Sequence, residues 1–227
     1  MTDTSKEGSR VAMIVTIDGP AGSGKSTVAR LLADRLQIRY LDTGAMYRAI
    51  ALAVVQAEFD ENDCDAVTQV ARSSTVEFRG DDIYLNGLNV TDEIRSANVT
   101  AVASIVAANP DVRQRLVELQ QNIGILGDLV TEGRDQGTVV FPEADHKFFV
   151  TASLMIRARR RHQEMLARGS TLPLQTVKSQ LRRRDHRDEN REYAPMKPAS
   201  DAQVINTSDM SIGEVVEELT ARIRPTV

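Results

Sequence analysis

Residues 19–27 read Gly19-Pro20-Ala21-Gly22-Ser23-Gly24-Lys25-Ser26-Thr27, and this stretch decides the fold. It matches the pattern G-x-x-x-x-G-K-[ST] at every fixed position, which is typical of a loop that wraps around phosphate groups. Glycines let such a loop turn tightly and bring its backbone N–H groups within reach of phosphate oxygens. We expect Lys25 to reach the β- and γ-phosphates of a nucleotide, and the Ser26 hydroxyl to bind Mg²⁺.

The residues on both sides of this loop support the same interpretation. Residues 11–17 form a short apolar, β-branched run, which predicts a buried parallel strand. Residues 28–36 carry apolar side chains at the spacing of one helical face. A strand, a glycine-rich loop and a helix in this order set the positive end of the helix against a bound phosphate. An accidental glycine-rich turn, the alternative, would not account for the two flanking elements.

Composition limits the class of protein. A chain of 227 residues can hold one α/β domain with insertions, or one core with small mobile appendages. It is 41% hydrophobic and 26% charged, so we expect a soluble globular protein. No apolar run approaches the length of a membrane span. Residues 1–10 lack the apolar segment of a signal peptide, and we expect them to be a frayed tail. The single cysteine, Cys64, excludes an intrachain disulfide and suits a reducing compartment, so we expect a cytoplasmic protein.

The net charge of −4 hides an uneven distribution. Residues 157–191 hold ten arginines and Lys178 against four acids, so this segment carries +7 and the remaining chain −11. Such a run is often a solvated face or a nucleic-acid patch. In a chain with a phosphate-binding loop it can equally cover bound phosphates, because arginine holds a phosphate with two parallel hydrogen bonds.

Strands and helices are predicted to alternate along most of the chain. Apolar periodicity predicts four more strands, at 38–41, 128–132, 147–151 and 204–207. It predicts further helices at 45–57, 98–107, 111–123, 153–168, 177–187 and 212–223. This alternation indicates a five-stranded parallel sheet with helices on both faces.

Residues 62–97 break the alternation. After a short helix at 62–72, polar and apolar residues alternate over 75–79 and 82–85 across a Gly80-Asp81 turn, and a third strand is possible at 88–90. This arrangement predicts a small antiparallel unit inserted into the α/β chain.

Polar residues stand near the beginning of the helix at 45–57. Thr43 is placed to cap this helix. Arg48 lies in its first turn, where a cation is unfavourable unless an anion binds beside it. A bound anion therefore explains Arg48 better than the alternative, a surface arginine.

A second polar group follows the strand at 128–132. Glu132 ends this strand, and Arg134 and Asp135 follow in a predicted loop at 133–138. Ligands of open α/β sheets lie at the carboxyl ends of the strands. We therefore expect these three residues at a binding site and not in an exposed ion pair.

Together with the glycine-rich loop, three stretches of this chain resemble bacterial cytidylate kinases. They are Leu41-Asp42-Thr43-Gly44-Ala45-Met46-Tyr47-Arg48, Glu132-Gly133-Arg134-Asp135-Gln136-Gly137-Thr138-Val139-Val140-Phe141-Pro142 and Arg184-Asp185-His186-Arg187-Asp188-Glu189-Asn190-Arg191. The second contains the specific pattern G-R-D-x-G-T-V-V-F-P. The resemblance runs from about residue 11 to the C-terminus, with the motifs in the same order.

The resemblance implies how the chain is divided. It implies one P-loop kinase domain over residues 1–227, with its core at about 11–61, 98–156 and 200–227. The insertion at about 62–97 matches the enlarged monophosphate-binding region of the family, and residues of about 157–191 match its short lid.

The resemblance also implies a reaction. In this family, with Mg²⁺, the γ-phosphate of ATP passes to CMP or dCMP, giving CDP or dCDP and ADP. The family places cytosine against a serine, an arginine and an aspartate, which correspond to Ser104, Arg113 and Asp135. Such a set suits cytosine, whose N4 amino group donates a hydrogen bond while its N3 and O2 atoms accept.

The remaining site residues follow from the same resemblance. The sugar is implied near Arg184 and Asp188, and the acceptor phosphate against Arg48, Arg134 and Arg191, with Thr43 nearby. The family usually has an aspartate where Glu132 stands, and a role at Mg²⁺, direct or through water, is implied for this carboxylate. The residues implied in catalysis are Lys25, Arg134, Arg184 and Arg187, the last two as lid arginines that close on the transferring phosphoryl group.

A monophosphate acceptor is largely dianionic at neutral pH, because its second pKa is about 6, so no general base is required. We therefore expect surface positions for His146, His162 and His186.

Three other functions compete with this one. A GTP-binding switch should carry an Asn-Lys-x-Asp signature, and none of the five lysines follows an asparagine. A nucleic-acid-binding ATPase would explain the basic segment, but that segment lacks the interleaved aromatic residues of a strand-binding surface. A kinase for another small acceptor stays open. The expected partners are ATP, CMP and dCMP, without nucleic acid or membrane, and the family suggests a monomer.

Overall fold

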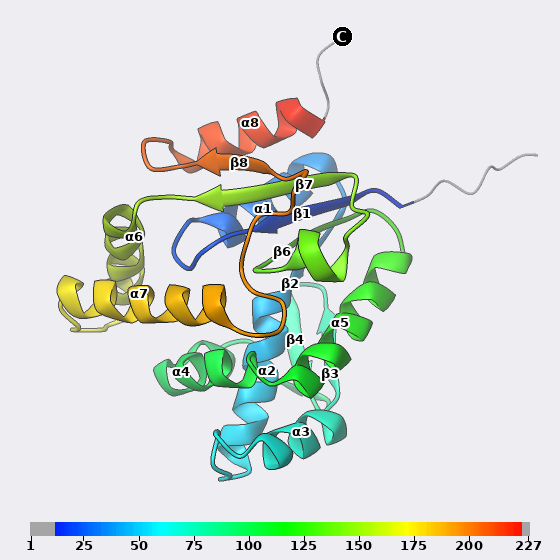
Figure 1. Ribbon diagram of the computed structural model, residues 1–227, viewed down its shortest axis with the longest axis vertical. Coiled ribbons are helices and arrows are strands. Elements are labelled where there is room, and N and C mark those ends of the chain that lie inside the picture. Colours follow the sequence, from blue (N-terminus) through cyan, green and yellow to red (C-terminus); the bar gives the residue numbers. More distant parts are fainter. Residues whose placement is uncertain (1–11, 224–227) are drawn as a thin grey trace, which may run out of the picture.

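Five parallel strands form the central sheet of the computed structural model, which describes residues 12–223 (Figure 1). Their order is β2-β6-β1-β7-β8, and every neighbouring pair is parallel. The strands are β1 (Ile14–Asp18), β2 (Arg39–Asp42), β6 (Leu129–Gly133), β7 (His146–Thr151) and β8 (Gln203–Asn206). The predicted parallel sheet is confirmed. The predicted tail at 1–10 and the first predicted strand residue, Val11, lie outside the described residues.

Helices cover both faces of this sheet, as predicted. α1 (Lys25–Leu36) and α8 (Ile212–Ile223) pack on one face around the buried Leu32 and Leu219. On the other side α2 (Thr43–Gln56), α4 (Ala97–Val106) and α5 (Pro110–Ile125) share a second apolar cluster with Leu129 of β6. Figure 1 shows α8 above the sheet and the second group of helices below it. None of the helices within residues 12–223 is long and apolar enough to cross a membrane.

The insertion forms a separate antiparallel sheet, as its alternating pattern predicts, and its apolar side chains join the cluster of α2, α4 and α5. Its elements are α3 (Cys64–Ser73), β3 (Val76–Arg79), β4 (Asp82–Leu85), β5 (Leu88–Asn89) and the 3-10 turn η1 (Glu93–Arg95). The three strands form an antiparallel sheet in the order β3-β4-β5. Asp81 lies in the turn between β3 and β4 and forms an ion pair with Arg30 of α1, with 2.5 Å between Asp81 Oδ1 and Arg30 Nη1. The insertion therefore also contacts α1.

The basic segment folds into two helices beyond the carboxyl end of β7 (Figure 1). α6 (Leu154–Ala167) and α7 (Leu174–Asn190) pack against each other around Ala158, Val177 and Leu181. α7 is longer than the predicted helix at 177–187. A buried pair between Arg157 and Asp185 (2.5 Å) also joins the two helices. Arg157 Nη1 donates to the Ala21 carbonyl at 3.1 Å, which connects this pair of helices to the glycine-rich loop.

Two local predictions were wrong. The loop expected at 133–138 contains a π-helical turn, η2 (Gln136–Val140), because the Asp18 carboxylate accepts the backbone N–H groups of Gln136 and Gly137, each at 2.8 Å. The cap of α2 is Asp42, whose side chain accepts the Ala45 N–H at 2.9 Å, and not Thr43. The Thr43 hydroxyl instead donates to the Glu132 carbonyl at 2.7 Å.

Candidate active site

A cavity of about 480 Å³ lies at the carboxyl ends of β1, β2 and β6, bounded by α1, α4, α6 and α7. It contains most of the residues that the sequence predicts for the site. Besides the loop residues 21–27, those that line it are Thr43, Arg48, Ser104, Arg113, Glu132, Arg134, Asp135, Arg184, Asp188 and Arg191. Segments far apart in the sequence thus converge on one space, as the rule for open α/β sheets predicts.

The glycine-rich loop runs from the end of β1 into α1, and its backbone geometry requires glycine at Gly19, Gly22 and Gly24. A side chain at Gly19 would lie 2.1 Å from the Val150 carbonyl oxygen. Gly24, the residue before α1, has φ of 89°, a conformation that residues with side chains rarely adopt. The loop therefore lies directly against β7 and presents the N-terminus of α1 to the cavity.

Lys25 is buried between the loop and Glu132. Its Nζ atom donates to the Pro20 carbonyl at 3.2 Å and lies 3.8 Å from Glu132 Oε2. Burial, and then the positive charge of Arg134, lowers the pKa of Lys25 to about 7. Lys25 therefore loses its proton more readily in the free protein than an exposed lysine does. An anion bound in the cavity would favour the charged amine and raise this pKa.

Glu132 links the donor side of the cavity to the sheet. Ser26 Oγ donates to Glu132 Oε1 at 2.8 Å. Burial raises the pKa of Glu132, and the nearby Lys25 opposes this rise. A hydroxyl and a carboxylate side by side are oxygen ligands of the kind that Mg²⁺ prefers. These two residues fit a Mg²⁺ ion that takes its other ligands from phosphates and water.

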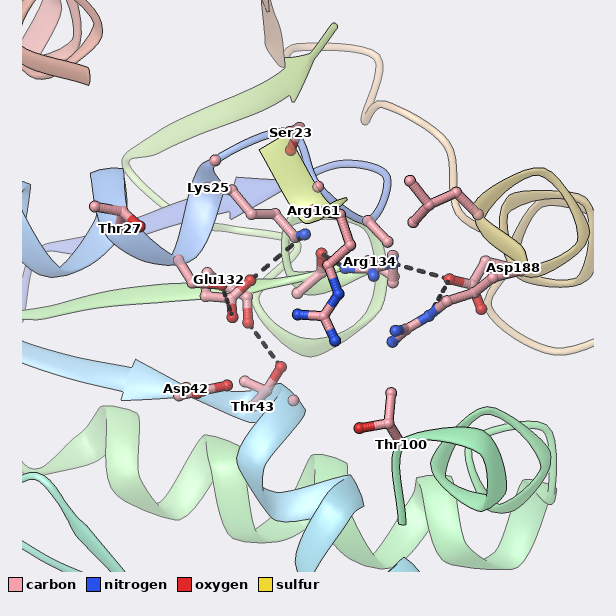
Figure 2. A pocket seen from close by; sticks show the side chains of 18 of the residues that line it. Ser23, Lys25, Thr27, Asp42, Thr43, Thr100, Glu132, Arg134, Arg161 and Asp188 are labelled. Carbon is pink, nitrogen blue, oxygen red and sulfur yellow. Dashed lines mark hydrogen bonds and ion pairs between the residues drawn. The ribbon is translucent and has the colours of Figure 1, made fainter. Parts of the chain in front are cut away.

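Arg134 and Asp188 lie farther along the cavity from Lys25 (Figure 2), and Arg184 lines the cavity as well. Arg134 Nε donates to Asp188 Oδ2 at 2.9 Å, and Arg184 Nε lies 3.9 Å from the same oxygen. Burial, and then the charge of Arg134, lowers the pKa of Arg184 to about 10. Among residues 12–223, Arg184 Nε has no hydrogen-bond partner. The cavity therefore contains more arginine donors than its carboxylates satisfy.

A buried ion pair lies at the α4 side of the cavity. Arg113 of α5 pairs with Asp135, and both side chains are 5% exposed. Arg191, at the end of α7, lies 3.7 Å from the other carboxylate oxygen of Asp135. Arg113 also stacks over the Tyr47 ring at 5.5 Å, and Ser104 lines the same region from α4. The three residues predicted for the base thus border one part of the cavity.

Other predictions meet the structure less directly. Arg48 pairs with Asp42 at 3.1 Å, so a carboxylate of the protein holds it in the absence of an anion. Arg187 is exposed and is not among the lining residues, so the structure does not bring it into the cavity. The three histidines, His146, His162 and His186, also lie outside the lining.

Sequence reasoning missed several lining residues. Arg161 points from α6 into the middle of the cavity (Figure 2), and Arg160 lines it too. Together with Arg157 they have the i, i+3, i+4 spacing of one helical face, which could have identified them. Met210, Ile212 and Val215 line another part of the cavity near the start of α8, but they belong to no motif.

Comparisons of the sequence with known proteins agree on one family. The sequence profile of the family described as cytidylate kinase matches residues 15–225. The cytidylate kinase of Symbiobacterium thermophilum is 42% identical over 231 residues, covering 100% of both chains. That of Mycobacterium avium is 46% identical over 217 residues, covering 93% of this chain and 95% of the other. A solved structure, of an uncharacterized protein from Eubacterium ventriosum, shares the fold alone, with a TM-score of 0.50 and 13% identity over 95% of this chain and 99% of that one.

Proposed function

The chain belongs to the cytidylate kinase family, and from this premise we propose that it transfers the γ-phosphate of ATP to CMP or dCMP, giving CDP or dCDP and ADP. The observation that carries the proposal is the position of the Arg113–Asp135 pair in the same cavity as the glycine-rich loop. One region suits a triphosphate, and the other suits a base with one donor and two acceptors.

The donor is proposed to bind along the glycine-rich loop. Its β- and γ-phosphates would meet Lys25 and the N-terminus of α1. Mg²⁺, held by Ser26 and by Glu132 directly or through water, would neutralise charge on these phosphates. The apolar Met210, Ile212 and Val215 offer a surface for the adenine ring.

The acceptor phosphate is proposed to bind among Arg48, Arg134 and Arg191, with Thr43 nearby. In the free protein each of these arginines lies near a carboxylate, on Asp42, Asp188 or Asp135. The carboxylates hold the arginines in place until a phosphate takes over part of their hydrogen bonding. The arrangement is thus prepared for an anion before the substrate arrives.

The chemistry follows from charge. The acceptor phosphate is already an anion, so the protein has to align two polyanions and offset their repulsion, and no base has to remove a proton. Lys25, Arg134 and Arg184 would stabilise the transferring phosphoryl group. Arg187 stays a predicted contributor, and Arg161 is better placed to join them.

The helices α6 and α7 are proposed to be the lid, and the insertion at about 62–97 the monophosphate-binding region, of a single domain. Closure of both would exclude water that would otherwise hydrolyse ATP. We propose a monomer, as the family resemblance suggests, and a cytoplasmic location, which suits the free thiol of Cys64.

The base is proposed to be read by Asp135, which accepts from the cytosine amino group, while Arg113 and Ser104 donate to its acceptors. The test is ADP formation with a panel of CMP, dCMP, UMP, AMP and non-nucleotide acceptors. We expect CMP or dCMP to give the highest kcat/KM. A higher value for a non-nucleotide acceptor would identify a kinase of another substrate class on this scaffold.

A further inference from the structure

Any residue is allowed at position 136 in the pattern G-R-D-x-G-T-V-V-F-P. In this protein the side chain of Gln136 is almost wholly buried, and both its amide oxygen and its amide nitrogen form hydrogen bonds. Gln136 is 1% exposed. Thr131 Oγ1 donates to Gln136 Oε1 at 2.9 Å, and Gln136 Nε2 donates to Gln120 Oε1 at 2.9 Å. Its backbone N–H also donates to Asp18, as described above. Three groups from three different elements thus determine where this glutamine lies.

The surroundings leave Gln136 little freedom. A side chain added at Gly133, at the end of β6, would lie 2.8 Å from Gln136 Cγ and 3.0 Å from its Nε2. The glutamine therefore packs closely against the backbone that carries Arg134 and Asp135. Gln136 itself is not among the residues that line the cavity, so it has no direct contact with a ligand there.

Two routes connect Gln136 to the ion pair proposed to read the base. The first is covalent, because Asp135 is the preceding residue and the N-cap of η2. The second passes through packed side chains: Gln136 donates to Gln120, the Gln120 amide lies near the Tyr47 hydroxyl although its Nε2 atom has no hydrogen-bond partner among residues 12–223, and the Tyr47 ring lies under the Arg113 guanidinium. Both members of the Arg113–Asp135 pair are thus connected to the same buried amide.

We propose that Gln136 is a positioning residue that fixes the Arg113–Asp135 pair and thereby sets the discrimination between cytosine and uracil. The inference rests on the proposed function. Cytosine needs an acceptor and a donor at fixed places, so a small displacement of either partner weakens cytosine binding most. Uracil presents a carbonyl to Asp135 already, and it loses little when the pair moves.

The variant that tests this is Gln136→Met, which keeps the length of the side chain but removes its polar atoms. It leaves the Thr131 hydroxyl and the Gln120 carbonyl without their partner. We expect the ratio of kcat/KM for CMP to that for UMP to narrow by about tenfold, the equivalent of one or two lost hydrogen bonds. The ratio should narrow because kcat/KM for CMP decreases, while the KM of ATP stays unchanged.

Gln121→Met is the matched control. Gln121 is the next residue of α5 and donates to the Val140 carbonyl of the same π-helical turn at 3.0 Å, but it has no part in the chain of contacts to Arg113. Its variant should keep the ratio of the parent protein. A ratio that narrows equally in both variants would mean that any loosening of η2 acts in this way, and the proposal would be wrong.

A double variant shows whether Gln136 acts through Asp135. If it does, the ratio in Asp135→Ala/Gln136→Met narrows by less than the product of the two single effects, because one of the two positioned groups is already gone. Strictly multiplicative effects of the two changes on this ratio would overturn the proposal. If the Gln136→Met protein does not fold, Gln120→Met is the alternative, because it removes the oxygen that accepts the hydrogen bond of the Gln136 amide. We expect it to narrow the CMP:UMP ratio in the same way.

The outcomes separate this inference from the function on which it rests. A parent protein that prefers CMP, with a narrowed ratio in Asp135→Ala but an unchanged ratio in Gln136→Met, keeps the function and rejects the role of Gln136. A parent protein without any preference for CMP rejects the function itself, and the inference with it.

Discussion

Lys25 lies where ligand and loop meet, and its side chain packs against Pro20 and Glu132 and not in an apolar cluster. Lys25→Ala should therefore leave the fold intact. It should lower kcat by at least about a thousandfold, since one positioned cation at such a site contributes on the order of several kcal/mol. Lys197→Ala, at an exposed lysine outside the cavity, is the control in the same ADP-formation assay. Near-normal turnover by a folded Lys25→Ala protein would contradict the assignment of this loop to ATP.

Proton uptake should accompany ATP binding. The pKa of Lys25 in the free protein is about 7, below its ordinary value of 10.5, so the amine is mostly neutral at pH 8. The triphosphate favours the charged form, raises this pKa and draws about one proton from the buffer at pH 8. ATP affinity should fall as the pH rises above 7. Calorimetric titrations in two buffers of different ionisation enthalpy measure the uptake. Equal apparent enthalpies in both buffers at pH 8 would disprove it.

Asp135 and Arg48 should affect the two pyrimidine nucleotides differently. Asp135→Ala removes the acceptor for the cytosine amino group, so the preference for CMP over UMP, expected at tenfold to several hundredfold by order of magnitude, should narrow. Arg48→Ala removes a contact to the phosphate that both nucleotides share, so it should slow both by similar factors. Measured kcat/KM values for CMP and UMP in the two variants decide the matter. If the Asp135→Ala protein keeps the ratio of its parent, Asp135 does not read the base.

At the scale of elements, the contact between α6 and α7 depends on a buried charge pair. Asp185→Ala would leave the Arg157 guanidinium buried without a carboxylate, which costs about 3 kcal/mol. For a domain of this size the melting temperature should fall by roughly 6–12 °C. Thermal unfolding followed by circular dichroism measures the change.

Glu218→Ala serves as the comparison for this experiment, because it breaks an exposed pair with Arg222 inside α8. That change should cost less than about 1 kcal/mol. A similar loss in both variants would mean that the Arg157–Asp185 pair has no special importance for the fold.

The elements that sequence could predict are those that depend on local patterns. The strand, loop and helix around Lys25 could be predicted from an apolar, β-branched run, a pattern of glycines and apolar residues at helical spacing. The π-helical turn η2 could not be predicted, because it depends on Asp18, whose side chain comes from 118 positions earlier in the chain. The cap of α2 was missed for a simpler reason, since Asp42 and Thr43 are both good capping residues and only the structure distinguishes them.

Much of the candidate site could be predicted as well, because motif residues at the ends of parallel strands converge by topology alone. The position of Arg187 was harder to predict, since α7 begins and ends outside the predicted range and the direction of each side chain depends on its packing. Arg161 could have been found from its helical spacing. The apolar lining from Met210 to Val215 could not, because such residues are equally common in cores.

At the scale of the whole molecule, ATP and CMP are expected to bind under one pair of helices. Ordering α6 and α7 over the cavity lowers their conformational entropy, which weakens binding of the first ligand. The second ligand binds to helices that are already ordered, so its binding is not weakened in this way. ADP and CMP, which cannot react, should together raise the melting temperature by more than the sum of their separate shifts. At about 100 times its Kd each ligand alone contributes roughly 2.7 kcal/mol, and a coupling of about 1–3 kcal/mol should come on top.

Differential scanning fluorimetry with each ligand and with both measures this coupling. The Arg48→Ala protein offers a control, because this substitution should weaken binding of the acceptor phosphate while leaving α6 and α7 unchanged. Strictly additive shifts in the parent protein would mean that the two ligands do not share a closing element.

The free thiol of Cys64 gives the molecule a built-in attachment point for a spectroscopic probe. It is the single cysteine of the sequence, it is exposed, and it stands at the start of α3 in the insertion. A maleimide dye or a fluorine tag would therefore label the natural chain at one place, with no cysteine to remove and none to introduce. The label sits on the region expected to move over the monophosphate and outside the residues that line the cavity. Its emission or chemical shift can follow that motion in real time during turnover.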